Sequence, residues 1–123
     1  MWEIETTDIF DEWYDALDSS DRSNVLASLL LLQTRGPMLP RPYADSVYGS
    51  RHNNMKELRI QSKGKPLRAF FAFDPDRRGI ILCAGDKAKD SKRFYQKMMG
   101  IADQEFDKHL IKLKRGQKHG KNT

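Results

Sequence analysis

The sequence predicts an α+β domain in which helices pack against an antiparallel sheet. Apolar residues recur at helical spacing near the N-terminus and again in the last third of the chain. Between positions 55 and 85 they alternate instead with a period of two. Short turns join the alternating segments, which favours antiparallel pairing of the strands. With 123 residues, the chain is long enough for one hydrophobic core but not for two.

The N-terminal segment is predicted to form a strand and a helical hairpin. Residues 2–6 alternate apolar and acidic side chains, and Thr7 or Asp8 can cap the helix that follows. The apolar stripe of this helix consists of Phe10, Trp13, Tyr14 and Leu17. A second helix is expected from 19–21 to Thr34, where Gly36 and Pro37 stop it. The linker is short, so the two helices are expected to be antiparallel.

A long loop separates these helices from the strands. Residues 36–54 are rich in proline, glycine and asparagine, and a loop of this length in a small domain is often functional. Strands are predicted at 55–61, 67–74 and 79–85, and a final helix from 90 or 91 to about 113. We therefore expect a single domain over residues 1–113 and a basic, disordered tail over 114–123.

Composition excludes several classes of protein. The chain is 38% hydrophobic and 32% charged, which is typical of a soluble globular domain. Its one cysteine, Cys83, excludes an internal disulfide and argues against a cysteine-based zinc site. The longest apolar run, Val25–Leu32, is too short to span a membrane. The acidic N-terminus does not resemble a signal peptide, so we expect a cytoplasmic location without membrane association.

Charge is distributed unevenly along the chain. The first 21 residues contain eight acidic side chains and no Lys or Arg, whereas the remaining residues carry 22 Lys or Arg against nine acidic residues. A domain that is basic except along one edge favours a polyanionic ligand such as RNA. The acidic cluster itself is interpreted as a solvated helix face, because several of its members lie near a helix N-terminus.

The first hairpin of the sheet is predicted to place two arginines opposite each other. If the strands pair across the turn at 62–65, Ile60 faces Leu67 and Arg59 faces Arg68. Two like charges in a cross-strand pair are destabilising unless an anion lies between them. One interpretation is a phosphate clamp made of two guanidinium groups. The alternative is that Glu57, on the same face, bridges an arginine and the pair is an ordinary sheet surface.

The segment after the third strand is also basic. Lys87, Lys89, Lys92 and Arg93 fall within seven residues, and the first two precede the helix where cations are unfavourable. Together with Lys56, these lysines are the expected RNA-phosphate ligands, although a solvated charge run explains them almost equally well.

RNA cleavage also needs a general base, for which His52 and Glu57 are the candidates. We expect no metal and no cofactor, because Asp74 and Asp76 lie in a turn sequence without a third ligand.

Four segments of the sequence resemble a known group of proteins. They are MKELRI, LRAFFAFD, ILCAGDKAKDSKRFY and IAD followed by F and HL. In this order and spacing they resemble the HigB-like branch of the RelE/ParE superfamily, the toxins of type II toxin–antitoxin systems, over roughly residues 1–113. The resemblance implies a RelE-like, microbial-RNase-like fold and a ribosome-dependent endoribonuclease that acts on mRNA without a metal.

By position, Arg59 matches the arginine that ends the E-L-R strand motif of these toxins. Arg68 matches the arginine of the next strand, which binds the scissile phosphate in related toxins. Lys87 and Lys89 match a Gly-x-x-Lys-Lys run that is split here as GDKAK. Some relatives end in a tyrosine or histidine soon after the last strand, whereas this chain continues into a long helix. The general acid therefore stays unassigned.

The resemblance further implies a cognate antitoxin, which would be a HigA-like helix-turn-helix protein. The protein would contact operator DNA only through this antitoxin. Its substrate would be mRNA on the ribosome. Two other functions remain open from the sequence: a ParE-like gyrase inhibitor without nuclease activity, and a non-catalytic RNA-binding regulator.

Overall fold

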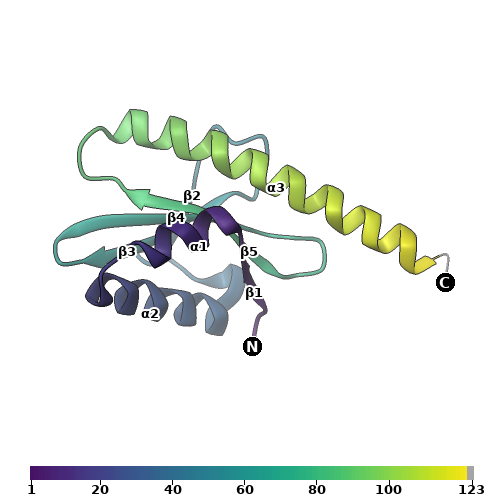
Figure 1. Cartoon of the computed structure of the whole chain (residues 1–123), viewed down its shortest axis with the longest axis horizontal. Coiled ribbons are helices and arrows are strands. Elements are labelled where there is room, and N and C mark those ends of the chain that lie inside the picture. Colours follow the sequence, from purple (N-terminus) through teal and green to yellow (C-terminus); the bar gives the residue numbers. More distant parts are fainter. Residues whose placement is uncertain (122–123) are drawn as a thin grey trace.

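The computed structural model describes residues 1–121, with side chains described as far as residue 116. One mixed sheet forms the middle layer, and helices cover both of its faces (Figure 1). In chain order the elements are β1 (Ile4–Thr6), α1 (Asp8–Asp15), α2 (Ser19–Arg35), the 3₁₀ turn η1 (Gly36–Met38), β2 (Ala44–Ser46), β3 (Lys56–Ser62), β4 (Lys65–Phe73), β5 (Gly79–Asp86) and α3 (Ser91–Lys121). The predicted α+β class is confirmed.

The sheet has five strands rather than three in antiparallel array, in the order β1-β5-β4-β3-β2. The three central strands are the predicted ones, and Arg59 pairs with Arg68 in the predicted register. β1 adds to one edge, parallel to β5. β2 adds to the other edge and lies inside the loop expected at 36–54. Its three residues are too few to produce an alternating pattern, so the sequence did not reveal it.

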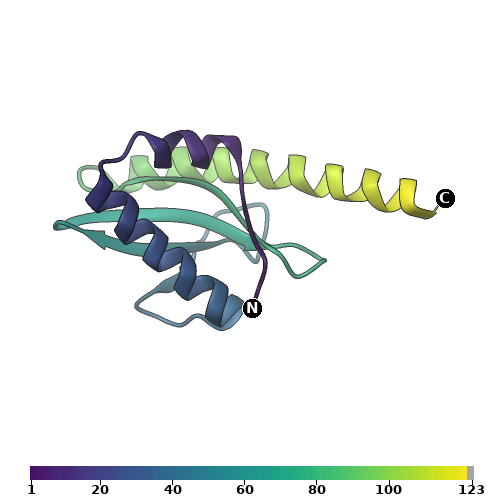
Figure 2. The same ribbon diagram turned by 60° about the horizontal axis from the view of Figure 1, so that its bottom comes forward.

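The first two helices cover one face of the sheet. Thr7 caps α1 by accepting a hydrogen bond from the amide of Phe10, as predicted. Figure 2 shows α2 turning back at an angle to α1, so that α1 packs on β5 and α2 packs on β3. Phe10, Val25 and Leu32 are buried here against Leu58 and other sheet residues.

α3 covers the other face, a placement that the sequence had not assigned. Met98, Ala102 and Phe106 pack on Met55 and Phe70. Gly85 lets the helix approach closely, because a Cβ at this position would lie 2.9 Å from the ring of Phe94. The approach brings the first turns of α3 beside Arg68, the cross-strand partner of Gly85.

α3 also continues past its predicted end at Leu113 to Lys121, and its C-terminal part projects beyond the sheet in both ribbon views (Figures 1 and 2). The basic residues from 114 to 121 therefore belong to the helix instead of forming a separate disordered tail. Lysine and arginine are good helix formers, and cations are favourable near a helix C-terminus. The rest of the expected tail, residues 122 and 123, lies outside the described residues.

Part of the acidic N-terminal cluster has a structural role. Asp21 is buried and accepts hydrogen bonds from Ser62 and Lys65, while Asp18 pairs with Lys63. These contacts lower the pKa of the Asp21 carboxyl, chiefly through Lys65. The start of α2 is thereby attached to the β3–β4 turn.

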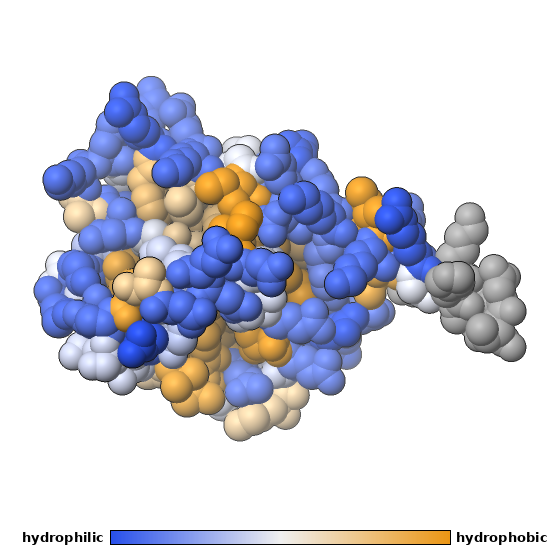
Figure 3. All heavy atoms as spheres, viewed as in Figure 1, coloured by the Kyte–Doolittle hydropathy of each residue, from blue (hydrophilic) through white to orange (hydrophobic). Residues whose placement is uncertain are grey.

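The surface is consistent with the composition. On the face seen in Figure 3, hydrophilic side chains predominate and hydrophobic ones occur in separate small areas. Within the described part of the chain, no helix is both long and apolar enough to cross a membrane.

Candidate active site

The opposed arginines of β3 and β4 share a buried carboxylate. Glu57, whose side chain is 4% exposed, lies with one oxygen 3.4 Å from Nη2 of Arg59 and the other 3.6 Å from Nε of Arg68. The anion that relieves the repulsion between the arginines is therefore part of the protein. This corresponds to the alternative interpretation in which Glu57 bridges the pair, and it extends that bridge to both arginines.

The two arginines differ in their environments. The side chain of Arg68 is 8% exposed and donates a hydrogen bond to the carbonyl of Leu67 at 3.0 Å. Its Nε is buried without a hydrogen-bond partner. The side chain of Arg59 is 35% exposed and also contacts Asp45 of β2 at 3.3 Å. Of the two, Arg59 is thus the one that an incoming phosphate can reach.

Tyr95, from the first turns of α3, completes the cluster. Its hydroxyl donates a hydrogen bond to Oε1 of Glu57. Burial, together with the Glu57 carboxylate, raises the pKa of Tyr95 to about 12. The phenol consequently stays protonated at neutral pH, so Tyr95 acts as a donor to Glu57.

A pocket opens beside this cluster. Its volume is about 330 Å³, and its lining residues are Asp45, Ser46, Val47, Tyr48, Glu57, Arg59, Tyr95 and Met99. Asp45 carries a negative charge here, because its hydrogen bond with Arg41 lowers the pKa of the carboxyl. Because Glu57 and the partly exposed Arg59 both line the pocket, it connects the cluster to the surface of the protein.

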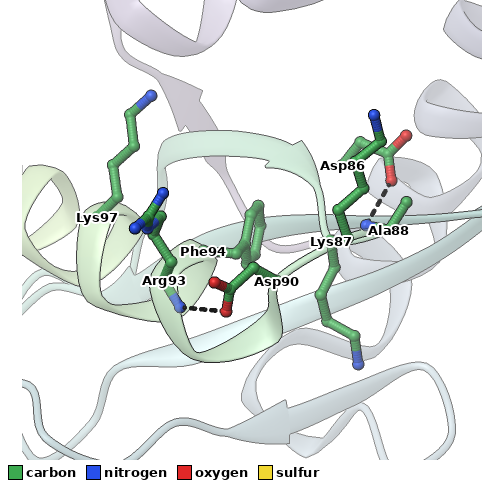
Figure 4. A pocket seen from close by; sticks show the side chains of 8 residues that line it. Asp86, Lys87, Ala88, Asp90, Arg93, Phe94 and Lys97 are labelled. Carbon is green, nitrogen blue, oxygen red and sulfur yellow. Dashed lines mark hydrogen bonds between the residues drawn. The ribbon is translucent and has the colours of Figure 1, made fainter.

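A second, basic pocket lies at the β5–α3 loop. It measures about 380 Å³ and is lined by Asp86, Lys87, Ala88, Lys89, Asp90, Arg93, Phe94 and Lys97. Figure 4 shows that Lys97 and Arg93 point to one side, whereas Lys87 extends to the opposite side. The amino group of Lys87 lies 5.9 Å from the centre of the Tyr95 ring. Lys87 thus lines the basic pocket and also approaches Tyr95 of the cluster, whereas Lys89 lines the basic pocket alone.

The remaining predicted site residues lie elsewhere. His52 pairs with Asp107 at 2.7 Å and packs edge-on against Phe106, well along α3 from Tyr95. Lys56 donates a hydrogen bond to the carbonyl of Pro37, below the opposite face of the sheet. Lys92 is exposed on the first turn of α3, outside the lining of both pockets. The structure therefore does not bring these three residues to Glu57.

Two residues of the site, Tyr95 of the cluster and Asp45 beside Arg59, were absent from the sequence-based set of candidates. Tyr95 lies on the apolar stripe of the helix, three residues before Met98 and seven before Ala102, so its spacing predicts a core residue and gives no signal of a polar contact with the sheet. Asp45 lies in β2, which the sequence did not reveal. Among the side chains that the structure describes, no three His, Cys, Asp or Glu residues gather in a way that could hold a metal ion.

Comparison with known proteins identifies the family. Residues 12–107 match the family model described as phage derived protein Gp49-like. Two curated relatives in Mycobacterium tuberculosis, named "Putative toxin HigB2" and "Putative toxin HigB3", are each 42% identical to this chain. The alignments cover 82% and 81% of the chain, respectively. They cover 51% of HigB2 and 86% of HigB3, so the chain spans about half the length of the former.

The fold is also similar to a solved structure. A mutant of the E. coli toxin RelE in the free state aligns with a TM-score of 0.56 and 10% identity, over 73% of this chain and 87% of RelE. At this identity the similarity concerns the fold alone. The family match and the two relatives show that the chain belongs to the Gp49-like family and is HigB-like, and its fold is similar to that of RelE.

Proposed function

We propose that this protein is the toxin of a type II toxin–antitoxin system and cleaves mRNA as an endoribonuclease, inhibiting translation and growth. The observation that carries the proposal is the Glu57 carboxylate, held by Arg59, Arg68 and Tyr95 in the wall of an accessible pocket. A carboxylate beside a guanidinium group provides both a proton acceptor and a stabiliser of anionic charge. These are two requirements of RNA cleavage through the 2′-hydroxyl.

In the proposed reaction Glu57 accepts the proton of the 2′-hydroxyl group while the 2′-oxygen of the ribose attacks the adjacent phosphorus. Arg59 stabilises the negative charge that develops on the phosphorane. The bond from phosphorus to the 5′-oxygen then breaks, and the ammonium group of Lys87 protonates the leaving oxygen. The products are a 2′,3′-cyclic phosphate and a 5′-hydroxyl end, and the step needs no metal.

The other cluster residues support Glu57. Arg68 does not line the pocket, and the hydroxyl of Tyr95 already donates its hydrogen to Glu57, so both are assigned to holding the carboxylate in place. Of the two bases considered from the sequence, Glu57 is favoured because His52 is engaged by Asp107 away from the pocket.

The proposed partners are a cognate antitoxin of a helix-turn-helix, HigA-like kind and mRNA on the ribosome, with operator DNA contacted only through the antitoxin. This places the activity in the cytoplasm, where messages are translated. The basic β5–α3 pocket, with Lys89 and Arg93, is suited to hold a neighbouring phosphate.

The test is to map mRNA 5′ ends after brief induction in cells. Wild-type protein should produce new 5′-hydroxyl ends at codon-phased positions, and Glu57→Gln and Arg59→Ala should not. Arg68→Ala is a poorer choice than Arg59→Ala, because Arg68 is buried. Intact messages despite arrested growth would refute the nuclease proposal, and induction of the DNA-damage response in those cells would favour a gyrase inhibitor.

A further inference from the structure

Tyr48 is an aromatic residue whose side chain is not packed into the hydrophobic core. Its side chain is 86% exposed, yet it lines the same pocket as Glu57 and Arg59. A ring this exposed gains little from packing, so the folded state by itself does not explain its position.

The backbone around Tyr48 is nevertheless well anchored. On one side, the amide of Val47 donates a hydrogen bond to the carbonyl of Met55 at 3.2 Å. On the other side, Ser50 donates to the buried carboxylate of Asp103 on α3. Between them Gly49 adopts a φ of 94°, a conformation that favours glycine and turns the chain directly after Tyr48. The exposed ring of Tyr48 is therefore attached to a backbone segment that is fixed on both sides.

The pocket beside the ring is lined by both charged and apolar side chains. Arg59, which is paired with Glu57 and Asp45, supplies a guanidinium group, while Val47 and Met99 supply apolar surface. A ligand that uses both the guanidinium group and the apolar surface has an anionic group and a flat apolar group attached to each other. A nucleotide unit of single-stranded RNA has this combination, and its base can stack on an aromatic side chain.

We propose that Tyr48 stacks on one unpaired nucleobase of the RNA strand, next to the phosphate bound at Arg59. This inference rests on the proposed function and adds a substrate-positioning residue to it. The neighbouring carboxylate of Asp45 is not free to read the base, because Arg41, Arg59 and the amide of Ser46 already occupy its oxygens. The subsite therefore holds a base by stacking and discriminates weakly between bases.

Binding of a non-cleavable strand tests the inference separately from cleavage. The ligands are a 2′-O-methyl RNA hexamer and an abasic sugar–phosphate strand of the same length. The proteins are wild type, Tyr48→Ala, Tyr48→Phe and, as a matched control, Tyr43→Ala. Tyr43 precedes β2 and is 49% exposed, but it does not line the pocket.

Loss of stacking should weaken binding of the base-bearing strand by Tyr48→Ala about tenfold or more. Its affinity for the abasic strand should stay unchanged, and Tyr48→Phe and Tyr43→Ala should bind both strands like wild type. Equal losses on the two strands, no loss on either, or wild-type protein that does not bind the base-bearing strand would each overturn the inference.

The two proposals can fail independently. If wild type cleaves mRNA in cells but Tyr48→Ala binds the hexamer normally, only the stacking inference is wrong. If the base-dependent loss is observed but no cleavage occurs, the stacking inference stands and the nuclease proposal is wrong.

Discussion

Tyr95 on α3 donates a hydrogen bond to Glu57 on β3, and this contact ties the last helix to the middle of the candidate active site. The raised pKa of the phenol, about 12, means that the donor persists throughout the neutral and mildly alkaline range. The two arginines hold the carboxylate from the sheet, and the tyrosine holds it from the helix. Disturbing α3 therefore disturbs the alignment of Glu57.

Tyr95→Phe removes this hydrogen bond and keeps the ring. We expect mRNA cleavage to fall by roughly tenfold, because a net hydrogen bond to a charged group is worth about 1.5–3 kcal/mol and its loss lets Glu57 move. The measurement is the yield of new 5′-hydroxyl ends after induction. Tyr14→Phe, a change on the opposite face of the sheet, is the control and should cleave normally. Full cleavage by Tyr95→Phe would show that the contact does not position Glu57.

Arg68→Ala and Arg59→Ala should differ in stability. Removing Arg68 leaves the buried Glu57 carboxylate poorly compensated, which costs about 3 kcal/mol in the free energy of unfolding. Removing the partly exposed Arg59 should cost less than about 1 kcal/mol. Urea denaturation of the two variants measures the difference. Equal losses would contradict the view that Arg68 is the structural member of the pair.

His52→Ala should leave mRNA cleavage unchanged. Asp107, the partner of His52, lies about 18 Å further along α3 than Tyr95, at 1.5 Å per residue. The variant should instead lower the melting temperature by a few degrees, since it removes the pair with Asp107 and the contact with Phe106. Asp107→Asn should have a similar effect on the melting temperature. A large loss of cleavage in His52→Ala would reinstate the histidine as the base.

Asp21 should make the stability of the fold depend on acidic pH. Its pKa is lowered in the folded state from the ordinary value of 3.8, chiefly by Lys65 and then by Ser62. The stabilisation is therefore fully present above pH 3.8 and is lost as the pH falls through the lower, folded-state value. Asp21→Asn should be less stable than wild type at pH 7 and approach it as the pH falls through the lowered pKa of the folded state. Chemical denaturation across this range provides the comparison, and parallel curves would contradict the assignment.

Cys83 should not react in the folded protein. Burial, with a further contribution from Glu105, raises the pKa of its thiol to about 12. Almost no thiolate forms at pH 8, and the side chain is shielded from reagents. A colorimetric disulfide reagent at pH 8 should label no thiol in native protein and one per chain after unfolding in urea. Rapid labelling of native protein would mean that α3 does not cover β5 as described.

Features that depend on neighbouring residues were predictable from the sequence. The alternation around β3 and β4, with the turn between them, placed Arg59 opposite Arg68 in the observed register. Thr7 was recognisable as one of two candidate helix caps, because the hydrogen bond that it accepts comes from an amide three residues away. These are short-range effects, in which spacing along the chain sets position in space.

Features that join distant segments of the chain could not be predicted without the three-dimensional structure. The three residues of β2 form a strand because they pair with β3, and no local sequence pattern predicts this strand. The face covered by α3 follows from packing of the whole sheet, and that packing places Tyr95 on Glu57 and His52 on Asp107. The residue types thus indicated which side chains could bind or cleave RNA. Tyr95 joins Glu57, Arg59 and Arg68 only because α3 packs on the sheet.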